Sequence, residues 1–161
     1  VKMVKQDDVR ETGEILEASA VLFKDLDGPL RVARGGGAIV AITSPGSTRV
    51  LPEYVVVGAS KAAIESIVRH LAVELSPRNI VVNAVSPGMA LTEALQHFDM
   101  MRSDAHIVER AISVTPAGRL ITPEDVAGVV AFLCSPAATM IRGQVIAVDG
   151  GATLLAPGVT P

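Results

Sequence analysis

Tyr54 and Lys61 are the two side chains whose types and spacing could carry chemistry, and they stand seven residues apart. A phenol alone is a weak proton donor, but a nearby ammonium stabilises the phenolate and makes the hydroxyl a better donor. Such a donor stabilises the negative charge that develops on a carbonyl oxygen when hydride adds to the molecule. On a helix, positions i and i+7 differ by only about 20° in direction, so the two side chains would share a face. The spacing therefore predicts one site built from a phenol and an ammonium.

Lys61 also has a purely structural interpretation. It lies at the edge of the apolar stripe of a helix predicted over residues 55–75. A lysine in that place can extend its ammonium to solvent, or pair with Glu65 four residues later in the weaker orientation of such a pair. Tyr54 is the only tyrosine of the chain and precedes the same helix, which favours the chemical interpretation.

Apolar runs that alternate with helical patterns indicate an α/β fold. Runs typical of buried parallel strands occupy residues 38–43, 80–85 and 144–148. Helical patterns occupy residues 15–26, 55–75, parts of 92–113, and 123–133 with Thr122 as N-cap. This order predicts a parallel sheet with helical crossovers.

The second predicted strand ends in a turn at Ser86, Pro87 and Gly88. Ligands of open α/β sheets bind at the carboxyl ends of the strands, so this turn is a candidate binding segment. Thr92 follows it, either as a plain N-cap or as a contact for an anion. Both roles can coexist because the start of a helix favours negative charge.

Composition excludes several classes of function. The 161 residues are 49% hydrophobic and carry a formal net charge of −3, which suits one domain and gives no basic surface for nucleic acid or membranes. No apolar run approaches the ~20 residues of a membrane-spanning helix. The single cysteine, Cys134, is expected to be buried. Because one cysteine cannot form a disulfide within the chain, a reducing cytoplasmic location is expected. The histidines lack the spacing of a zinc site, so no metal is expected.

Taken together, Tyr54, Lys61, the Pro87-Gly88 turn and Thr92 resemble the active-site half of a short-chain dehydrogenase/reductase. Most members of that superfamily carry tyrosine four residues before the lysine, where this chain has Val57. A tyrosine seven residues before the lysine is similar to the enoyl-acyl-carrier-protein reductases. The resemblance covers about residues 35–155 and implies a partial Rossmann-like, doubly wound parallel sheet of about three strands with flanking helices.

The resemblance implies roles for the matching residues. Tyr54 would stabilise an enolate oxygen, and Lys61 would also bind the nicotinamide ribose of NADPH or NADH. Ser44 is either a catalytic hydroxyl or a cap for the turn before Pro45, and both interpretations stay open. The remaining contacts would be Pro87, Gly88, Ala90 and Thr92 for the cofactor, and Leu95, Phe98 and Met101 for an acyl chain or for ordinary packing.

The resemblance does not extend to the family's first strand and its Gly-rich phosphate loop. That loop follows a strand and opens a helix, whereas Gly35-Gly36-Gly37 precedes a strand. We therefore expect a polar arm and helix over residues 1–34, the C-terminal half of a domain over 35–161, and weak cofactor binding. The strand nearest the missing half would also have an unpaired edge.

Three functions are compatible with these features. The first is reduction of the carbon-carbon double bond of an enoyl thioester on acyl carrier protein or coenzyme A, as in fatty-acid or polyketide synthesis. The second is another activity of the superfamily, such as ketoacyl reduction. The third is a non-catalytic half-domain. Because family members associate through the corresponding helices, a homo-oligomer through residues 55–75 and 92–113 is expected.

Overall fold

The computed structural model of the protein describes residues 35–52, 54–90, 106–156 and 159. The helix predicted over residues 15–26 lies outside this part of the chain. Within it, no helix has the length and apolar character needed to cross a bilayer.

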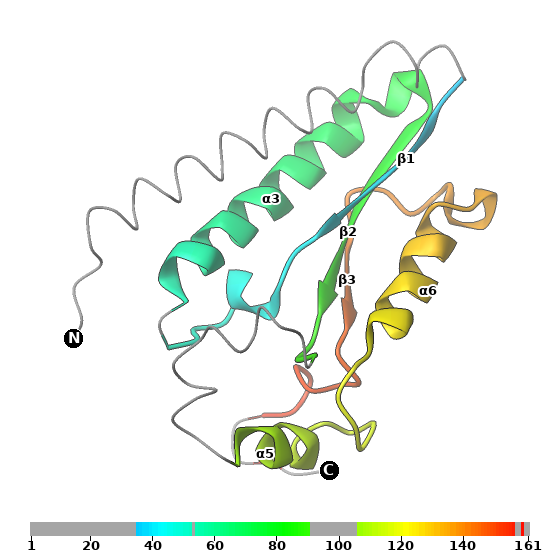
Figure 1. Ribbon diagram of the computed structural model, residues 1–161. Coiled ribbons are helices and arrows are strands. Elements are labelled where there is room, and N and C mark those ends of the chain that lie inside the picture. The colour runs from blue at the N-terminus through cyan, green and yellow to red at the C-terminus, as the bar shows by residue number, and fades with distance from the viewer. Residues whose placement is uncertain (1–34, 53, 91–105, 157–158, 160–161) are drawn as a thin grey trace.

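The described strands form one parallel sheet, as the sequence predicted. Its order is β1 (Gly37–Ile42), β2 (Ile80–Pro87) and β3 (Val145–Val148), with β2 in the centre. Ala41 pairs with Ala84, and Ala84 pairs with Val145. All three arrows point toward the end of the sheet where α5 lies (Figure 1). β1 is an edge strand of the described sheet, as expected.

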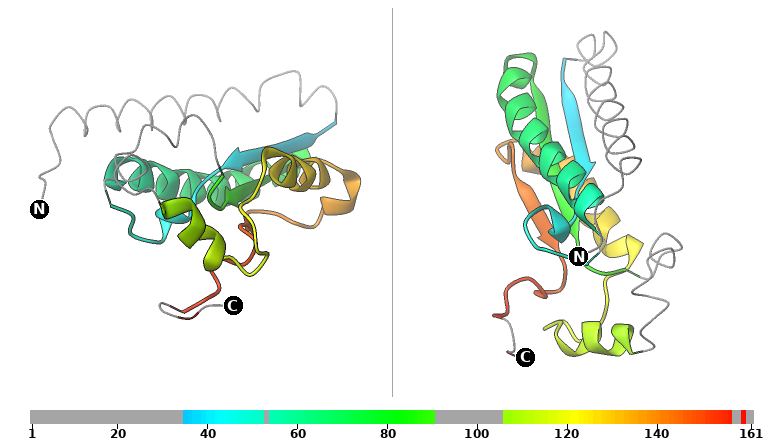
Figure 2. Two further views of the ribbon diagram at one scale, coloured as in Figure 1. Left: turned by 60° about the horizontal axis from the view of Figure 1, so that its bottom comes forward. Right: turned by 90° about the vertical axis from the view of Figure 1, so that its left-hand side faces the viewer.

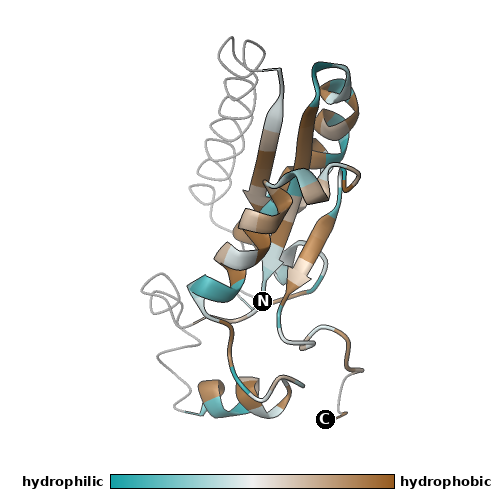
Figure 3. Ribbon diagram, turned by 90° about the vertical axis from the view of Figure 1, so that its right-hand side faces the viewer, coloured by the Kyte–Doolittle hydropathy of each residue, from teal (hydrophilic) through white to brown (hydrophobic). Residues whose placement is uncertain are grey.

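Helices cover both faces of the sheet. α3 (Val55–Glu74) packs on one face and α6 (Pro123–Leu133) on the other, while the short α5 (Ile107–Ser113) lies beyond the strand ends (Figures 1 and 2). The core under α3 includes Ile39, Ile64, Val68 and Val82. The core under α6 includes Val85, Leu133 and Ala138. The strands are correspondingly hydrophobic between the two helices (Figure 3).

β2 is two residues longer than predicted, because it includes Ser86 and Pro87. The backbone nitrogens of Ala84 and Gly88 both donate toward the β3 side, to Gln144 and Val148. Since successive residues of a strand alternate in direction, the nitrogen of Pro87 faces the β1 side. β1 has already ended there, at Ile42 opposite Val85. A proline, which lacks an N–H, therefore fits this central strand without breaking a ladder bond.

The prediction for Cys134 was wrong, because its side chain is exposed. It caps the C-terminal end of α6, and its neighbour Leu133 is the buried residue. The periodic pattern of a helix end does not fix which of two adjacent apolar residues faces the core.

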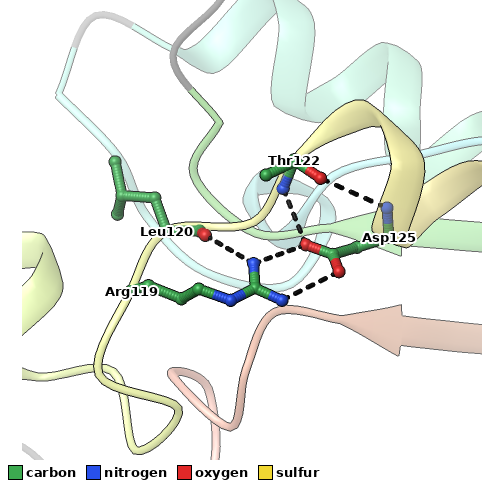
Figure 4. Close-up of polar contacts among 4 residues, drawn as sticks. All are labelled: Arg119, Leu120, Thr122 and Asp125. Atoms are coloured by element: carbon green, nitrogen blue, oxygen red, sulfur yellow. Dashed lines mark hydrogen bonds and ion pairs between the residues drawn. The ribbon is translucent and has the colours of Figure 1, made fainter.

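The start of α6 is a capping box, as predicted. The Thr122 hydroxyl accepts from the Asp125 nitrogen at 3.4 Å, and the Asp125 carboxylate accepts from the Thr122 nitrogen at 2.8 Å. Arg119 donates to both oxygens of this carboxylate, at 2.6 and 2.9 Å (Figure 4). The hydrogen bonds from Arg119, followed by the one from the Thr122 backbone, hold the pKa of Asp125 well below its usual range.

Thr122→Ala should destabilise the protein by about 1 kcal/mol, because it removes the side-chain acceptor at the N-terminus of α6. The free energy of unfolding in urea measures this loss. Thr122→Ser keeps the acceptor and should be close to the parent protein. Equal losses in the two variants would show that the hydroxyl is not what caps the helix.

Candidate functional site

Tyr54 is the residue immediately before α3, where it occupies the N-cap position. Its phenol is half-buried, and its hydroxyl donates a hydrogen bond to Ser44 Oγ at 3.2 Å. Ser44 lies two residues beyond the end of β1 and also accepts from the Gly46 nitrogen at 3.2 Å. Ser44 is therefore the N-cap of the short turn Pro45–Ser47, as one of the two interpretations predicted. The same oxygen also accepts from the phenol.

Lys61 lies in the second turn of α3 and reaches back to the same strand end. Its Nζ donates to the backbone oxygen of Ile42, the last residue of β1, at 3.1 Å. Partial burial lowers the pKa of Lys61 from its ordinary value, because desolvation disfavours the charged form. The alternative pairing with Glu65 does not occur: Glu65 instead accepts a hydrogen bond from Thr43 Oγ1 at 2.7 Å.

The end of β1 thus brings three of the predicted site residues together. Ser44 holds the phenol of Tyr54, and Ile42, two residues earlier, holds the ammonium of Lys61. A helix that begins at Val55 places Lys61 on its second turn, so both side chains project toward the strand end. Both groups therefore lie at the same strand end, while their direct pairing and the catalytic roles of the three residues stay predictions.

The predicted cofactor segment lies at the end of the neighbouring strand. Pro87 ends β2, and the Gly88 nitrogen donates to the Val148 oxygen at 2.8 Å. A side chain at Gly88 would meet the backbone of Asp149 at 2.8 Å, so only glycine fits this approach. The Thr43 nitrogen donates to the Val85 oxygen at 2.8 Å and joins the ends of β1 and β2. Ala90 is the last described residue of the turn, whereas Thr92, Leu95, Phe98 and Met101 lie outside the described residues.

A cavity of about 270 Å³ opens beside these strand ends, on the face that α3 covers. Glu65, Ser86 and Asp149 line its walls, together with Arg49 and Thr153 from the two adjoining loops. Ser86 belongs to the predicted binding turn and Glu65 was considered only as a partner of Lys61, whereas Arg49, Asp149 and Thr153 were not predicted from the sequence. Asp149 was recognisable, because it precedes a Gly-Gly pair at a strand end. Arg49 and Thr153 gave no comparable signal.

Two hydrogen-bonded loops border this cavity. The Asp149 carboxylate accepts from the Gly151 nitrogen at 2.9 Å and from the nitrogen of Thr153 at 2.9 Å and its hydroxyl. Burial opposes ionisation of Asp149, but these hydrogen bonds outweigh it and lower the pKa of the carboxyl. The Arg49 guanidinium donates to the backbone oxygen of Thr153. The loop that follows Ser44 is therefore tied to the loop that follows β3.

Two glycines make room for the phenol. A Cβ at Gly46 would lie 2.4 Å from the Tyr54 ring, and a Cβ at Gly58 would lie 2.6 Å from the Gly46 oxygen. Gly58 is buried within α3, so the helix, the loop and the ring are packed directly against one another. Any side chain at Gly58 must push the loop that carries Ser44.

Gly58→Ala should therefore lower stability, although alanine has the higher helix propensity. Gly128→Ala is the matched control, because Gly128 also lies within a helix and an added Cβ there meets nothing within 4 Å. The control should stabilise the protein by about 0.5–1 kcal/mol. Urea unfolding of both variants measures the difference, and stabilisation of both would mean that the loop moves at no cost.

Comparisons with known proteins identify relatives of this chain. A family model described as Enoyl-(Acyl carrier protein) reductase matches residues 2–153. The chain is 39% identical over 128 residues to 1-cyclohexenylcarbonyl-CoA reductase of Streptomyces collinus, which covers 80% of this chain and 45% of that protein. It is 35% identical over 144 residues to 7alpha-hydroxysteroid dehydrogenase of Escherichia coli K12, which covers 89% of this chain and 55% of that protein.

A solved structure shows the same fold. It is a putative NAD(P) dependent gluconate 5-dehydrogenase from Beutenbergia cavernae with bound NADP, which aligns with a TM-score of 0.85 at 35% identity. The alignment covers 96% of this chain and 61% of that one. The chain thus spans about half the length of the curated relatives named above, 45% and 55%. One of these two relatives is named as a reductase of a CoA derivative and the other as a hydroxysteroid dehydrogenase.

Proposed function

This chain belongs to the short-chain dehydrogenase/reductase family, and we propose that it reduces the carbon-carbon double bond of an enoyl thioester with NADPH or NADH. The observation that carries the proposal is the hydrogen bond from the Tyr54 hydroxyl to Ser44 at the end of β1, with Lys61 bound to the same strand end. The thioester would be carried by acyl carrier protein or by coenzyme A.

The position of the phenol favours a double bond over a ketone. In ketone reduction, charge develops on the oxygen of the carbon that receives hydride. In an enoyl thioester, the charged oxygen lies two atoms further away. A proton donor displaced by about one helical turn suits that longer distance. Val57, half-buried on α3, occupies the place of the usual tyrosine and has no proton to donate.

Each residue of the site has a definable task. A bound nicotinamide would supply the hydride. With substrate bound, the Tyr54 hydroxyl would turn its single proton from Ser44 to the thioester oxygen, and the Ser44 hydroxyl would then donate to the phenol oxygen and hold it in position. The Lys61 ammonium would stabilise negative charge on the phenol oxygen. Partial burial of both side chains makes this electrostatic effect stronger than it would be in water.

The described residues fit the ribose end of such a cofactor. An ammonium has three N–H groups, and Ile42 accepts from one of those on Lys61. The others suit the vicinal hydroxyls of a ribose. Gly88 and Pro87 lie at the end of the adjacent strand, where ligands of parallel α/β sheets bind. Thr92, the proposed diphosphate contact, lies outside the described residues.

Cofactor oxidation distinguishes the candidate activities. The chain, mixed with NADPH or with NADH, should lose cofactor absorbance when crotonyl-CoA is added, and not when acetoacetyl-CoA is added. Reduction of the ketone alone would contradict the proposal and favour a ketoacyl reductase. Absence of both reactions would also contradict it.

A non-catalytic role through self-association is the second candidate. Val55 and Val73, on the outer side of α3, are 61% and 75% exposed. These two residues lie about five helical turns apart and so face the same side of α3, and on this basis we propose a homo-oligomer through α3 and residues 92–113. A folded oligomer in sedimentation, silent toward both thioesters, would select this function over reduction.

A further inference from the structure

Three consecutive residues at the end of β1 each bind one residue at or in α3. The Ile42 oxygen accepts from Lys61, Thr43 Oγ1 donates to Glu65, and Ser44 Oγ accepts from Tyr54. The first and third contacts hold the groups of the proposed site. The middle contact, between Thr43 and Glu65, involves neither the phenol of Tyr54 nor the ammonium of Lys61 and has no assigned task.

The middle contact is the most buried of the three. Thr43 is 3% exposed and Glu65 is 8% exposed, and their oxygens are 2.7 Å apart. A hydroxyl donates here to a carboxylate, which makes a short and strong hydrogen bond. The Thr43 hydroxyl also lies 3.5 Å from the Lys61 oxygen, and the Thr43 nitrogen is bound to the Val85 oxygen. Thr43 therefore links α3, β1 and the central strand β2.

A polar contact in this place is energetically costly. An apolar pair would fill the same space without burying a carboxylate. Unlike an apolar contact, a hydrogen bond depends on both distance and angle. The contact between Thr43 and Glu65 therefore fixes the rotation of α3 about its own axis and its position along β1. Glu65 lies one helical turn after Lys61, so the same rotation sets where the ammonium meets Ile42.

We propose that Thr43 and Glu65 are positioning residues that hold α3 against the end of β1, and thereby fix Tyr54 and Lys61 in their working geometry. This inference rests on the function proposed above for the same site. Glu65 also borders the cavity of about 270 Å³, so replacing its side chain by one of similar size does not overpack the interior.

Substitutions at Thr43 test the proposal. Thr43→Val keeps the shape and removes the donor, whereas Thr43→Ser keeps the donor. We expect Thr43→Val to lower kcat for crotonyl-CoA roughly 10- to 100-fold with little change in KM, because small misplacements of reacting groups are costly. Thr43→Ser and Glu65→Gln, which keep a hydrogen bond, should retain most of kcat. Equal losses in Thr43→Val and Thr43→Ser would overturn the proposal.

A double variant separates positioning from stability. Thr43→Val combined with Glu65→Leu removes both polar partners, and such a replacement can restore stability. If the two residues only stabilise the fold, kcat should return together with the unfolding midpoint. If they position the site, kcat should stay low in a protein of near-parental stability. Recovery of kcat in the double variant would overturn the proposal.

A signal that needs no turnover tests the positioning separately. Tyr54 is the chain's only tyrosine, so ring-labelled tyrosine gives one set of NMR signals. These signals should shift in Thr43→Val and stay near the parental position in Thr43→Ser. If the parent protein reduces neither thioester, the proposed function fails, while a shift specific to Thr43→Val still supports the positioning role. Unshifted signals in Thr43→Val would overturn that role in either case.

Discussion

Tyr54→Phe should lower kcat for crotonyl-CoA by about 10²–10³-fold, the usual effect of removing one donor from a developing oxyanion. The ring packs between Gly46 and Gly58, and phenylalanine keeps that packing. The fold should therefore be retained, with a loss of about 0.5–1.5 kcal/mol for the hydrogen bond to Ser44. Steady-state kinetics and urea unfolding on the same preparation measure both quantities.

Ser44→Ala is the matched control for Tyr54→Phe. It removes the other partner of the same hydrogen bond and leaves the phenol in place. Because the proton donor survives, the loss of kcat should be clearly smaller than in Tyr54→Phe. An unchanged kcat in Tyr54→Phe would remove the phenol from the chemistry, and equal losses would mean that the hydrogen bond matters more than the donor.

Lys61→Met should weaken NADPH binding and nearly abolish turnover. Hydrogen bonds from a charged donor contribute about 1.5–3 kcal/mol, which corresponds to an increase of about 10- to 100-fold in Kd. Methionine keeps the apolar part of the side chain, so packing of α3 should change little. Lys61→Arg keeps the charge but presents a planar group, and it should recover part of the binding. Titration of NADPH fluorescence gives Kd, and an unchanged Kd in Lys61→Met would contradict the ribose contact.

The lowered pKa of Lys61 predicts how activity and stability depend on pH. Burial lowers this pKa, so the ammonium loses its proton below the ordinary value of about 10.4. Activity should fall as pH rises through that lowered value. The unfolded chain keeps the proton to higher pH, so this residue makes the folded state more stable as pH rises across the same window. Lys61→Met should lack this gain in stability. A loss of activity that coincides with unfolding would contradict the assignment.

The elements around the site were predictable from local patterns. α3 ends at Glu74, one residue before the predicted end, because Ser76 and Pro77 terminate the helix. β1 and β3 each lie within one residue of the predicted strands. These signals are local, since apolar period and helix-terminating residues act on their own segment.

The contacts that organise the site were not predictable in the same way. Lys61 binds a backbone oxygen, and side-chain types carry no information about such a partner. Thr43 and Glu65 are 22 residues apart and belong to different elements, so only the packed helix brings them together. One signal did exist. Alternate residues of a strand share a face, so Thr43 lies on the same side as the buried residues Ile39 and Ala41. A polar residue on such a buried face needs a hydrogen-bond partner. The structure gives that residue its partner.

The most direct test of the site uses Tyr54 as a spectroscopic label. The chain has one tyrosine and no tryptophan, so magnetisation transfer from labelled tyrosine ring protons reports on this residue alone. With NADP⁺ and a saturated acyl thioester bound, we expect transfer from the Tyr54 ring to protons beside the thioester carbonyl. Transfer to neither ligand, under conditions where both demonstrably bind, would contradict the central claim that this phenol faces the reacting thioester.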